Sequence, residues 1–371
     1  MLRPLRPRRA AALATVTTLV AAAVALGMGH PGLQMARACG GFFRAKAIAP
    51  EKQPSLTREK VLIVHDADKG RQHFIREVAF TRATEPFGFV VPTPTRPQVA
   101  AVKKTPFTLL RKTFPFAAPM AIGRGGGGAK GGFGSGARPG VTVLEKKKVG
   151  SFTAFVLSAT DEKALAGWLS DNDLVSTKEA DLWLAHYVRM GFYYVAMRYD
   201  PPRRKAKEGS EGTVLAETMR ISFDSPLPYY PYLEPEPPAA MAGLGIVSPR
   251  LLELWVVGRE EMVPVALREQ DGERHWVRPL QGGQVTADAR KKLEAAFEDE
   301  VESLLPSGAL VVQTFQDQKN SRKGFADVLF APKEAQPATA QKVAKLEPLL
   351  GILDPQLVPA KVAPVAVEGD Q

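Results

Sequence analysis

The alternation of apolar and polar residues first marks a β-hairpin within residues 59–80. An apolar run at Val61–Val64 is followed by a turn at Asp68–Gly70 and by a second apolar series that ends at Phe80. Glycine at the last turn position can adopt the positive φ that a three-residue loop with a bulge requires. The pattern therefore predicts two antiparallel strands joined by a tight turn.

Other segments with strand character follow the hairpin. Phe87–Val91 predicts a third strand, which Pro92 is expected to end because proline donates no ladder hydrogen bond. The hairpin and this strand form only a small sheet, which needs an apolar surface to cover it. Further strands are predicted at residues 151–158, 192–199, 213–223, 251–257, 309–315 and 326–330.

Two helices are predicted in the middle of the chain by their caps and by apolar residues at helical spacing. The first spans Asp161–Ser170 with Thr160 as its cap. The second begins at a capping box formed by Ser176 and Glu179 and ends at Gly191. Its apolar face consists of Ala180, Trp183, Leu184, Tyr187 and Val188.

The longest predicted helix spans Ala287–Leu304. Strands outnumber helices and do not alternate with them regularly, which favours an α+β fold with largely antiparallel sheets and a few packed helices over a doubly wound parallel sheet. Gly123–Gly140 holds ten glycines in 18 residues, so we expect a disordered glycine-rich loop there.

This reading divides the chain into five parts. Residues 1–38 are a signal peptide, 39–122 a β-rich N-terminal half, and 123–140 the flexible loop. Residues 141–330 form an α+β half that we expect to pack on the first as one unit, and 331–371 are an Ala/Pro-rich tail.

The first residues have the order of an export signal. Arg3, Arg6, Arg8 and Arg9 precede the almost uncharged run Ala10–Met28, and Ala36-Arg37-Ala38 supplies an A-x-A cleavage pattern before Cys39. An uncleaved membrane anchor is the alternative, but alanine and threonine dominate the run and favour cleavage. We therefore expect an exported protein, in the periplasm, at the cell surface or secreted, without a membrane span in the mature chain.

Charge and cysteine content exclude several classes of function. Removal of residues 1–38 leaves 44 basic and 39 acidic residues, a net charge of +5 in place of +10. The basic residues form no aromatic-interleaved stripe, so no nucleic-acid partner is expected. Cys39 is the only cysteine, which excludes an intramolecular disulfide and zinc sites built on cysteine pairs. No cofactor is predicted.

Besides Cys39, two sets of residues are candidates for chemistry or binding. His65 and His73 lie symmetrically about Lys69, so they could face each other across the hairpin as half of a metal site. No further ligands are evident and cross-strand polar residues near a hairpin tip are ordinary, so no metal site is predicted. Tyr229-Tyr230-Pro231-Tyr232 is typical either of a sugar- or peptide-binding patch or of a packed loop. His186 and His275 are expected to be structural.

Several segments in order resemble an exported bacterial family of unknown function, domain-of-unknown-function family 2330 (DUF2330). These segments are Ala38–Phe43, Phe87–Pro94, Val149–Phe152, Leu165–Leu169, Ile221–Pro226 and Leu254–Gly258. The resemblance implies export and an envelope location but no established activity. Family members often carry a second cysteine just after the two aromatic residues, where this chain has Arg44, and some end in a membrane helix.

Cys39 would become the N-terminus after cleavage, and three interpretations of it stay open. It is preceded by Ala36 and Arg37, a poor match to a lipidation site. It could act as an N-terminal nucleophile with its own amine as base, or it could have no chemical role. The sequence favours a non-catalytic protein that binds an envelope protein, glycan or peptide, with a hydrolase using Cys39 as the alternative.

Overall fold

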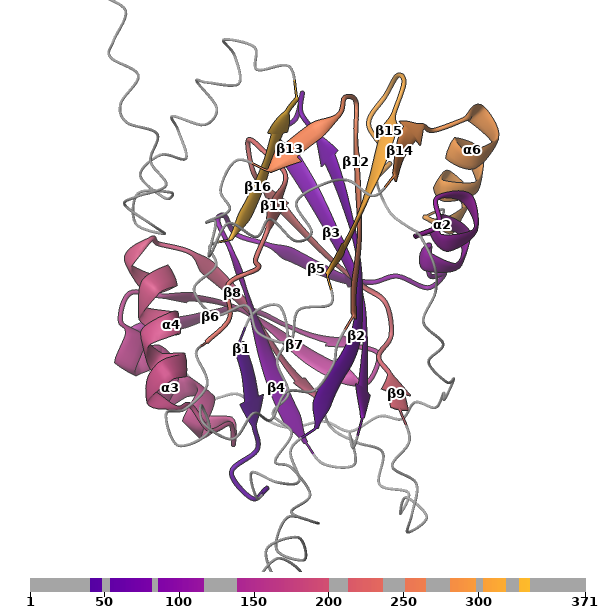
Figure 1. Ribbon diagram of the computed structural model, residues 1–371. Coiled ribbons are helices and arrows are strands. Elements are labelled where there is room, and N and C mark those ends of the chain that lie inside the picture. Colours follow the sequence, from indigo (N-terminus) through magenta and orange to yellow (C-terminus); the bar gives the residue numbers. More distant parts are fainter. Residues whose placement is uncertain are drawn as a thin grey trace, which may run out of the picture. The chain divides into compact units, whose positions relative to one another are not determined.

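The computed structural model describes residues 41–48, 54–81, 86–116, 139–199, 213–235, 251–264, 281–297, 303–317 and 327–333. The chain divides into two compact units, Met1–Leu33 and Gln34–Gln371, and all the described residues belong to the second. In this unit, two large sheets and a small one are combined with helices (Figure 1). Ala36, Ala38, Cys39 and His275 lie outside the described residues, as does the glycine tract up to Arg138.

The larger sheet is built around the predicted hairpin. Strands β2 (Ser55–Asp66) and β3 (Arg71–Thr81) pair antiparallel, and β2 also pairs in parallel with β12 (Leu251–Gly258). This is the only parallel pair among the described strands. The other members are β5 (Gln98–Ala101), β9 (Thr213–Leu215), β10 (Met219–Asp224), β14 (Gln281–Gln284) and β15 (Val311–Asp317). The strand order of the whole sheet is β14-β15-β12-β2-β3-β10-β5, and β9 pairs with β3.

The predicted third strand belongs to a different sheet from the hairpin. Strand β4 (Phe87–Thr93) lies in a five-stranded sheet of order β1-β4-β8-β7-β6, with β1 (Gly41–Arg44), β6 (Val141–Val149), β7 (Phe152–Ala159) and β8 (Tyr193–Tyr199). The expected end at Pro92 is wrong, since β4 continues to Thr93. In the described part of the chain, β1 pairs with Phe87–Val90 of β4, and Pro92 lies opposite Tyr194 of β8.

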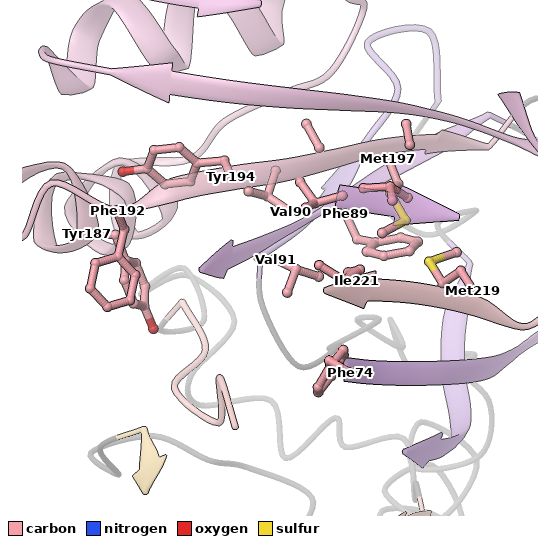
Figure 2. Close-up of a cluster of buried hydrophobic side chains, with 14 of the residues drawn as sticks. Phe74, Phe89, Val90, Val91, Tyr187, Phe192, Tyr194, Met197, Met219 and Ile221 are labelled. Atoms are coloured by element: carbon pink, nitrogen blue, oxygen red, sulfur yellow. The ribbon is translucent and has the colours of Figure 1, made fainter. Parts of the chain in front are cut away.

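A shared apolar core lies between the two sheets. Phe80 of β3 packs against Phe87 of β4 with their ring centroids 4.6 Å apart. Figure 2 shows Phe89 of β4 together with Met219 and Ile221 of β10 in this core. Residues on the opposite face of the β2–β3 hairpin, such as Leu62 and Ile75, belong to a second core. Successive apolar residues of the hairpin therefore point into two different cores, one on each face of the larger sheet.

Four helices among the described residues cover the outer faces of the sheets (Figure 1). α3 (Glu162–Asp171) and α4 (Lys178–Arg189) lie against the five-stranded sheet, where Trp168 packs on Phe155 with ring centroids 5.1 Å apart. α2 (Phe107–Thr113) and α6 (Ala287–Ala296) contribute Phe107, Leu110 and Leu293 to the second core.

The caps of α3 and α4 lie one residue later than predicted. The cap of α3 is Asp161 and not Thr160, because the Asp161 carboxylate accepts from the Ala164 amide. The cap of α4 is Thr177, whereas Ser176 bonds to the side chain of Asp181. Gly191, with a φ of 69°, follows the end of α4 as predicted. α6 ends at Ala296, so the predicted extension to Leu304 is wrong.

A small third sheet is formed by β11 (Tyr229–Tyr230), β16 (Val328–Pro332) and β13 (Met262–Pro264). Gln313 of β15 bonds to both the amide and the carbonyl of Met262, which attaches the small sheet to the larger one. The predicted α+β class with mainly antiparallel sheets is therefore confirmed. No helix of the described residues is long and apolar enough to cross a membrane.

The tip of the β6–β7 hairpin is fastened to the loop before β10. Gly150 has a φ of 56°, and the Glu217 carboxylate accepts from the amide of Ser151 at 3.1 Å and from its hydroxyl at 2.6 Å. A Cβ added to Gly150 would lie 2.4 Å from Cδ of Glu217. Glu217 can move away only by releasing both bonds, so glycine is required here by conformation and by space.

We predict that Gly150→Ala destabilises the protein more than Gly308→Ala does. Gly308 also has a positive φ, 79°, but an added Cβ there would meet nothing within 4 Å. The control should cost about 1 kcal/mol for the left-handed backbone alone, and Gly150→Ala roughly 1–2 kcal/mol more for the lost bonds of Glu217. Urea unfolding measures both. Equal losses would show that Glu217 does not constrain the hairpin.

Candidate functional site

The two hairpin histidines lie on opposite faces of the larger sheet. His65 pairs with Gln72, and His73 pairs with Val64, because four residues separate the last paired positions, Asp66 and Arg71. The predicted loop of three residues would have placed the histidines opposite each other. A one-residue change in register moves a side chain to the other face, so the suggested metal half-site is wrong. Within the described ranges, no group of three or more His, Cys, Asp or Glu residues could hold a metal.

The longer turn is held by Asp66. Its Oδ1 accepts from the amides of Asp68 and Lys69, at 3.1 and 3.3 Å. Burial acts to raise the pKa of Asp66, but hydrogen bonds from the Lys69 amide and side chain outweigh it and lower the pKa. The four-residue turn is therefore stabilised by the ionised carboxylate of Asp66, a local interaction that the alternation of apolar and polar residues does not reveal.

His73 forms a pair with Ser222 that has the composition of a nucleophile and its base. His73 Nδ1 lies 2.8 Å from Ser222 Oγ, and Arg220 donates to the same oxygen at 2.6 Å. Arginine can only donate, so the Ser222 oxygen accepts from Arg220, and in the tautomer with the His73 proton on Nε2 the Ser222 hydroxyl donates to Nδ1. Ser222 is 0% exposed, and burial together with Arg220 lowers the pKa of His73 to about 3. A buried hydroxyl and so weak a base favour a structural role over a catalytic one.

A buried ion pair joins β2 and β3 on the opposite face, between the two large sheets. Arg76 Nε lies 2.7 Å from Glu59 Oε1, and each side chain is 1% exposed. The guanidinium carbon lies 4.8 Å from the centre of the Phe89 ring, which belongs to the other sheet. Tyr230 reaches the second oxygen of Glu59 at 3.4 Å. We call Glu59 and Arg76 the interlayer pair.

The tyrosines at positions 229, 230 and 232 are buried, so the interpretation of this stretch as a packed loop is confirmed. Tyr230 and Tyr232 are each 0% exposed. The backbone of Tyr229 forms two bonds with the side chain of Gln72, and the Tyr232 hydroxyl donates to Asp317 of β15 at 2.9 Å. We call residues 229–233 the tyrosine segment, which connects the small sheet to β3, β2 and β15.

Asp327 attaches the tyrosine segment to helix α4. Its carboxylate accepts from the hydroxyls of Tyr187 and Tyr229 and from the amide of Leu233, the first and last at 2.9 and 2.8 Å. Trp183, one turn before Tyr187 in α4, donates to the Leu233 carbonyl at 3.1 Å. Burial raises the pKa of Asp327 to about 6 despite these hydrogen bonds, which act to lower it.

A further set of charges lies beneath helix α2 on the outer face of the larger sheet. Lys60 forms an ion pair with Glu77, which also accepts from Thr105 at 3.0 Å. Arg111 of α2 lies 3.2 Å from Glu253 of β12. Burial raises the pKa of Glu253, although the neighbouring basic residues oppose this effect. These contacts seat α2 on the sheet through charge as well as through Phe107.

The Ser222 pair, the interlayer pair and Asp327 are not among the sites predicted from the sequence. One signal was present in β10, where Arg220, Ser222 and Asp224 alternate with buried apolar residues and so share one face. His186, predicted to be structural, packs against Tyr187 with ring centroids 5.0 Å apart. Burial and Arg189 lower its pKa to about 4.

Comparison with known proteins identifies a family. Residues 34–234, more than half of the chain, match the family described as an uncharacterized protein conserved in bacteria, DUF2330. Among curated proteins, none matches the chain. The crystal structure of baculovirus P35 is similar with 7% identity and a TM-score of 0.35, over 75% of this chain and 97% of P35. That likeness establishes neither a common fold nor a common activity.

We predict that His73→Asn makes stability less sensitive to acid. The unfolded chain binds a proton at His73 near pH 6.5 and the folded protein does not, so this residue lowers stability as the pH falls from 6.5 toward 3. Asparagine can keep an acceptor for Ser222 without titrating. Between pH 6.5 and 5, the wild type should lose roughly 1.5 kcal/mol more than the variant. Parallel curves from urea unfolding would contradict the burial of a neutral His73.

Proposed function

We propose that this chain, which belongs to DUF2330, an uncharacterised protein family conserved in bacteria, is an exported envelope or secreted protein that works by binding and not by catalysis. Export is supported by the arginines at positions 3 to 9, the apolar run and the cleavage pattern ending at Ala38. The family match begins at residue 34, after almost all of this signal.

The non-catalytic role is supported by one observation: the polar side chains that could take part in catalysis are bonded within the described fold. Ser222, His73 and Asp327, which have the chemistry of catalytic groups, are buried and bonded to other parts of the same fold. A catalytic group must reach a substrate. These residues instead connect strands and layers, which supports a rigid scaffold that presents a binding surface to an envelope protein, glycan or peptide.

The N-terminal strand supports processing next to Cys39. β1 begins at Gly41, two residues after Cys39, and Phe43 is buried within it. A Cβ on Gly41 would lie 2.8 Å from the ring of Trp183, so the strand lies close to α4. Cleavage after Ala38 keeps the whole of β1 in the mature chain. The alternative function, a hydrolase with Cys39 as an N-terminal nucleophile, is open to a direct test.

We predict that the exported protein has the intact mass of residues 39–371 without acyl chains. Mass spectrometry after cell fractionation measures this, and retention of residues 1–38, or a cytoplasmic location, would overturn export. A diacylglycerol increment would show that Cys39 is a lipid anchor.

The same preparation tests catalysis through Cys39. Cys39→Ser should leave the melting temperature within a few degrees of the wild type, because a lone thiol at a chain end closes no loop. An activity-based, thiol-directed hydrolase probe should label the folded wild type no faster than the urea-unfolded protein. Rapid labelling that requires the fold and is lost in Cys39→Ser would replace the binding role with the hydrolase.

A further inference from the structure

Asp327 lies where three parts of the fold meet. It directly precedes β16, its Oδ2 binds the hydroxyls of Tyr187 in α4 and Tyr229 in β11, and its Oδ1 binds the Leu233 amide. The side chain is 0% exposed. Together with the bond from Trp183 to the Leu233 carbonyl, these contacts join the tyrosine segment and β16 to helix α4.

The groups that face Asp327 are hydrogen-bond donors without positive charge. Tyr187 comes from α4 and Tyr229 from β11, and backbone amides come from Tyr232 and Leu233. In the described part of the chain, Asp327 forms no ion pair with a basic side chain. The residues that donate hydrogen bonds to it are uncharged. A buried carboxylate without a cation is disfavoured relative to its protonated form.

Other titratable groups lie one step further from the carboxylate. Tyr194 of β8 interacts with Tyr187, and the ring of His186 packs against that of Tyr187 (Figure 2 labels Tyr187 and Tyr194). Glu234 is buried and follows Leu233 directly. Asp317 accepts from Tyr232. None of these groups supplies a positive charge at neutral pH, since the pKa of His186 is lowered to about 4.

We propose that Asp327 is a proton-operated clamp, which holds the tyrosine segment and β16 firmly on helix α4 when its carboxyl group is protonated and less firmly when it is ionised.

The tyrosine hydroxyls allow both states without a change in packing. In the ionised state both hydroxyls donate to Oδ2. In the protonated state the new O–H of Asp327 needs an acceptor, and a rotated tyrosine hydroxyl supplies one, because a hydroxyl both donates and accepts. The hydroxyls of Tyr187 and Tyr229 also interact with each other, so the rotated hydroxyl keeps a partner.

The direction of the pH effect follows from the difference between the folded and unfolded chains. The carboxyl group has a pKa near 3.8 when unfolded and about 6 when folded, so the folded protein binds the proton more tightly. The stability from this proton is complete below pH 3.8 and is lost as the pH rises through 6. Acidification therefore tightens the clamp, against the opposite effect of His73 and His186.

Asp327→Asn isolates the contribution of this group, because asparagine resembles the protonated acid and does not titrate. The unfolding equilibrium constants of the wild type and of the variant are measured by urea unfolding from pH 4 to pH 7. The ratio of the two constants, wild type over variant, should rise roughly 50-fold over this range. The histidine contributions are common to both proteins and cancel in the ratio.

Asp317→Asn is the matched control, since Asp317 is another buried aspartate bonded to a tyrosine hydroxyl. The ratio of the unfolding constants, wild type over Asp317→Asn, reports the general effect of replacing a buried aspartate in this region. The clamp requires that the ratio for Asp327→Asn rises with pH in excess of this control. A ratio for Asp327→Asn that is constant from pH 4 to pH 7 would overturn the proposal.

Tyr187→Phe keeps the proposal testable if Asp327→Asn does not fold. The hydroxyl of Tyr187 stabilises the ionised carboxylate and lowers its pKa, so its loss should move the carboxyl titration to higher pH. Carbon-13 NMR of aspartate carboxyl groups follows this titration directly in the wild type and in Tyr187→Phe. A buried aspartate resonance near pH 6 that shifts upward in the variant supports the clamp. The absence of any aspartate titrating above pH 5 would overturn it.

Discussion

Arg76 brings a full positive charge into the apolar space between the two large sheets, and the packing on both sides is arranged around that charge. Glu59 neutralises it from the neighbouring strand, and the ring of Phe89 covers it from the opposite sheet. Neither Nη atom has a hydrogen-bond partner among the described residues. The guanidinium is therefore stable only while β2, β3 and β4 keep their places, which makes the interlayer pair a strict constraint on how the sheets face each other.

The other buried polar groups extend this arrangement outward. Tyr230 connects Glu59 to the tyrosine segment, and Asp327 connects that segment to α4. On the outer face of the larger sheet, Glu253 connects Arg111 of α2 to β12. Each of these groups joins elements that are far apart in the sequence. Polar chemistry in the described fold thus serves attachment between layers, and this use is the physical basis for proposing a scaffold that binds.

Local pattern predicted the elements of the fold better than their partners. The hairpin, the β4 segment and α4 follow from alternation or helical spacing, which depend on neighbouring residues. β4 lies outside the sheet of the hairpin because it pairs with β8, which comes more than 100 residues later in the chain. Local alternation does not indicate this pairing. The register that separates His65 from His73 depends on one extra turn residue, held by Asp66.

The candidate sites were the least predictable part of the molecule. The tyrosines at 229–232 were open to two interpretations because composition does not indicate burial, and their partners Gln72 and Asp317 lie far away in the sequence. Asp327 stands alone before a strand, and nothing near it in the sequence indicates Tyr187. By contrast, the alternation of Arg220 and Ser222 in β10 was a readable signal of a shared polar face.

A double-mutant cycle on the interlayer pair tests most directly whether buried charges hold the sheets together. Arg76→Met and Glu59→Leu should each lower the free energy of unfolding by about 3–5 kcal/mol, because each leaves the other charge buried without its partner of opposite sign. The double variant should lose much less than the sum, since no unpaired charge is left. Losses below about 1 kcal/mol for each single variant, or additive losses, would contradict the account.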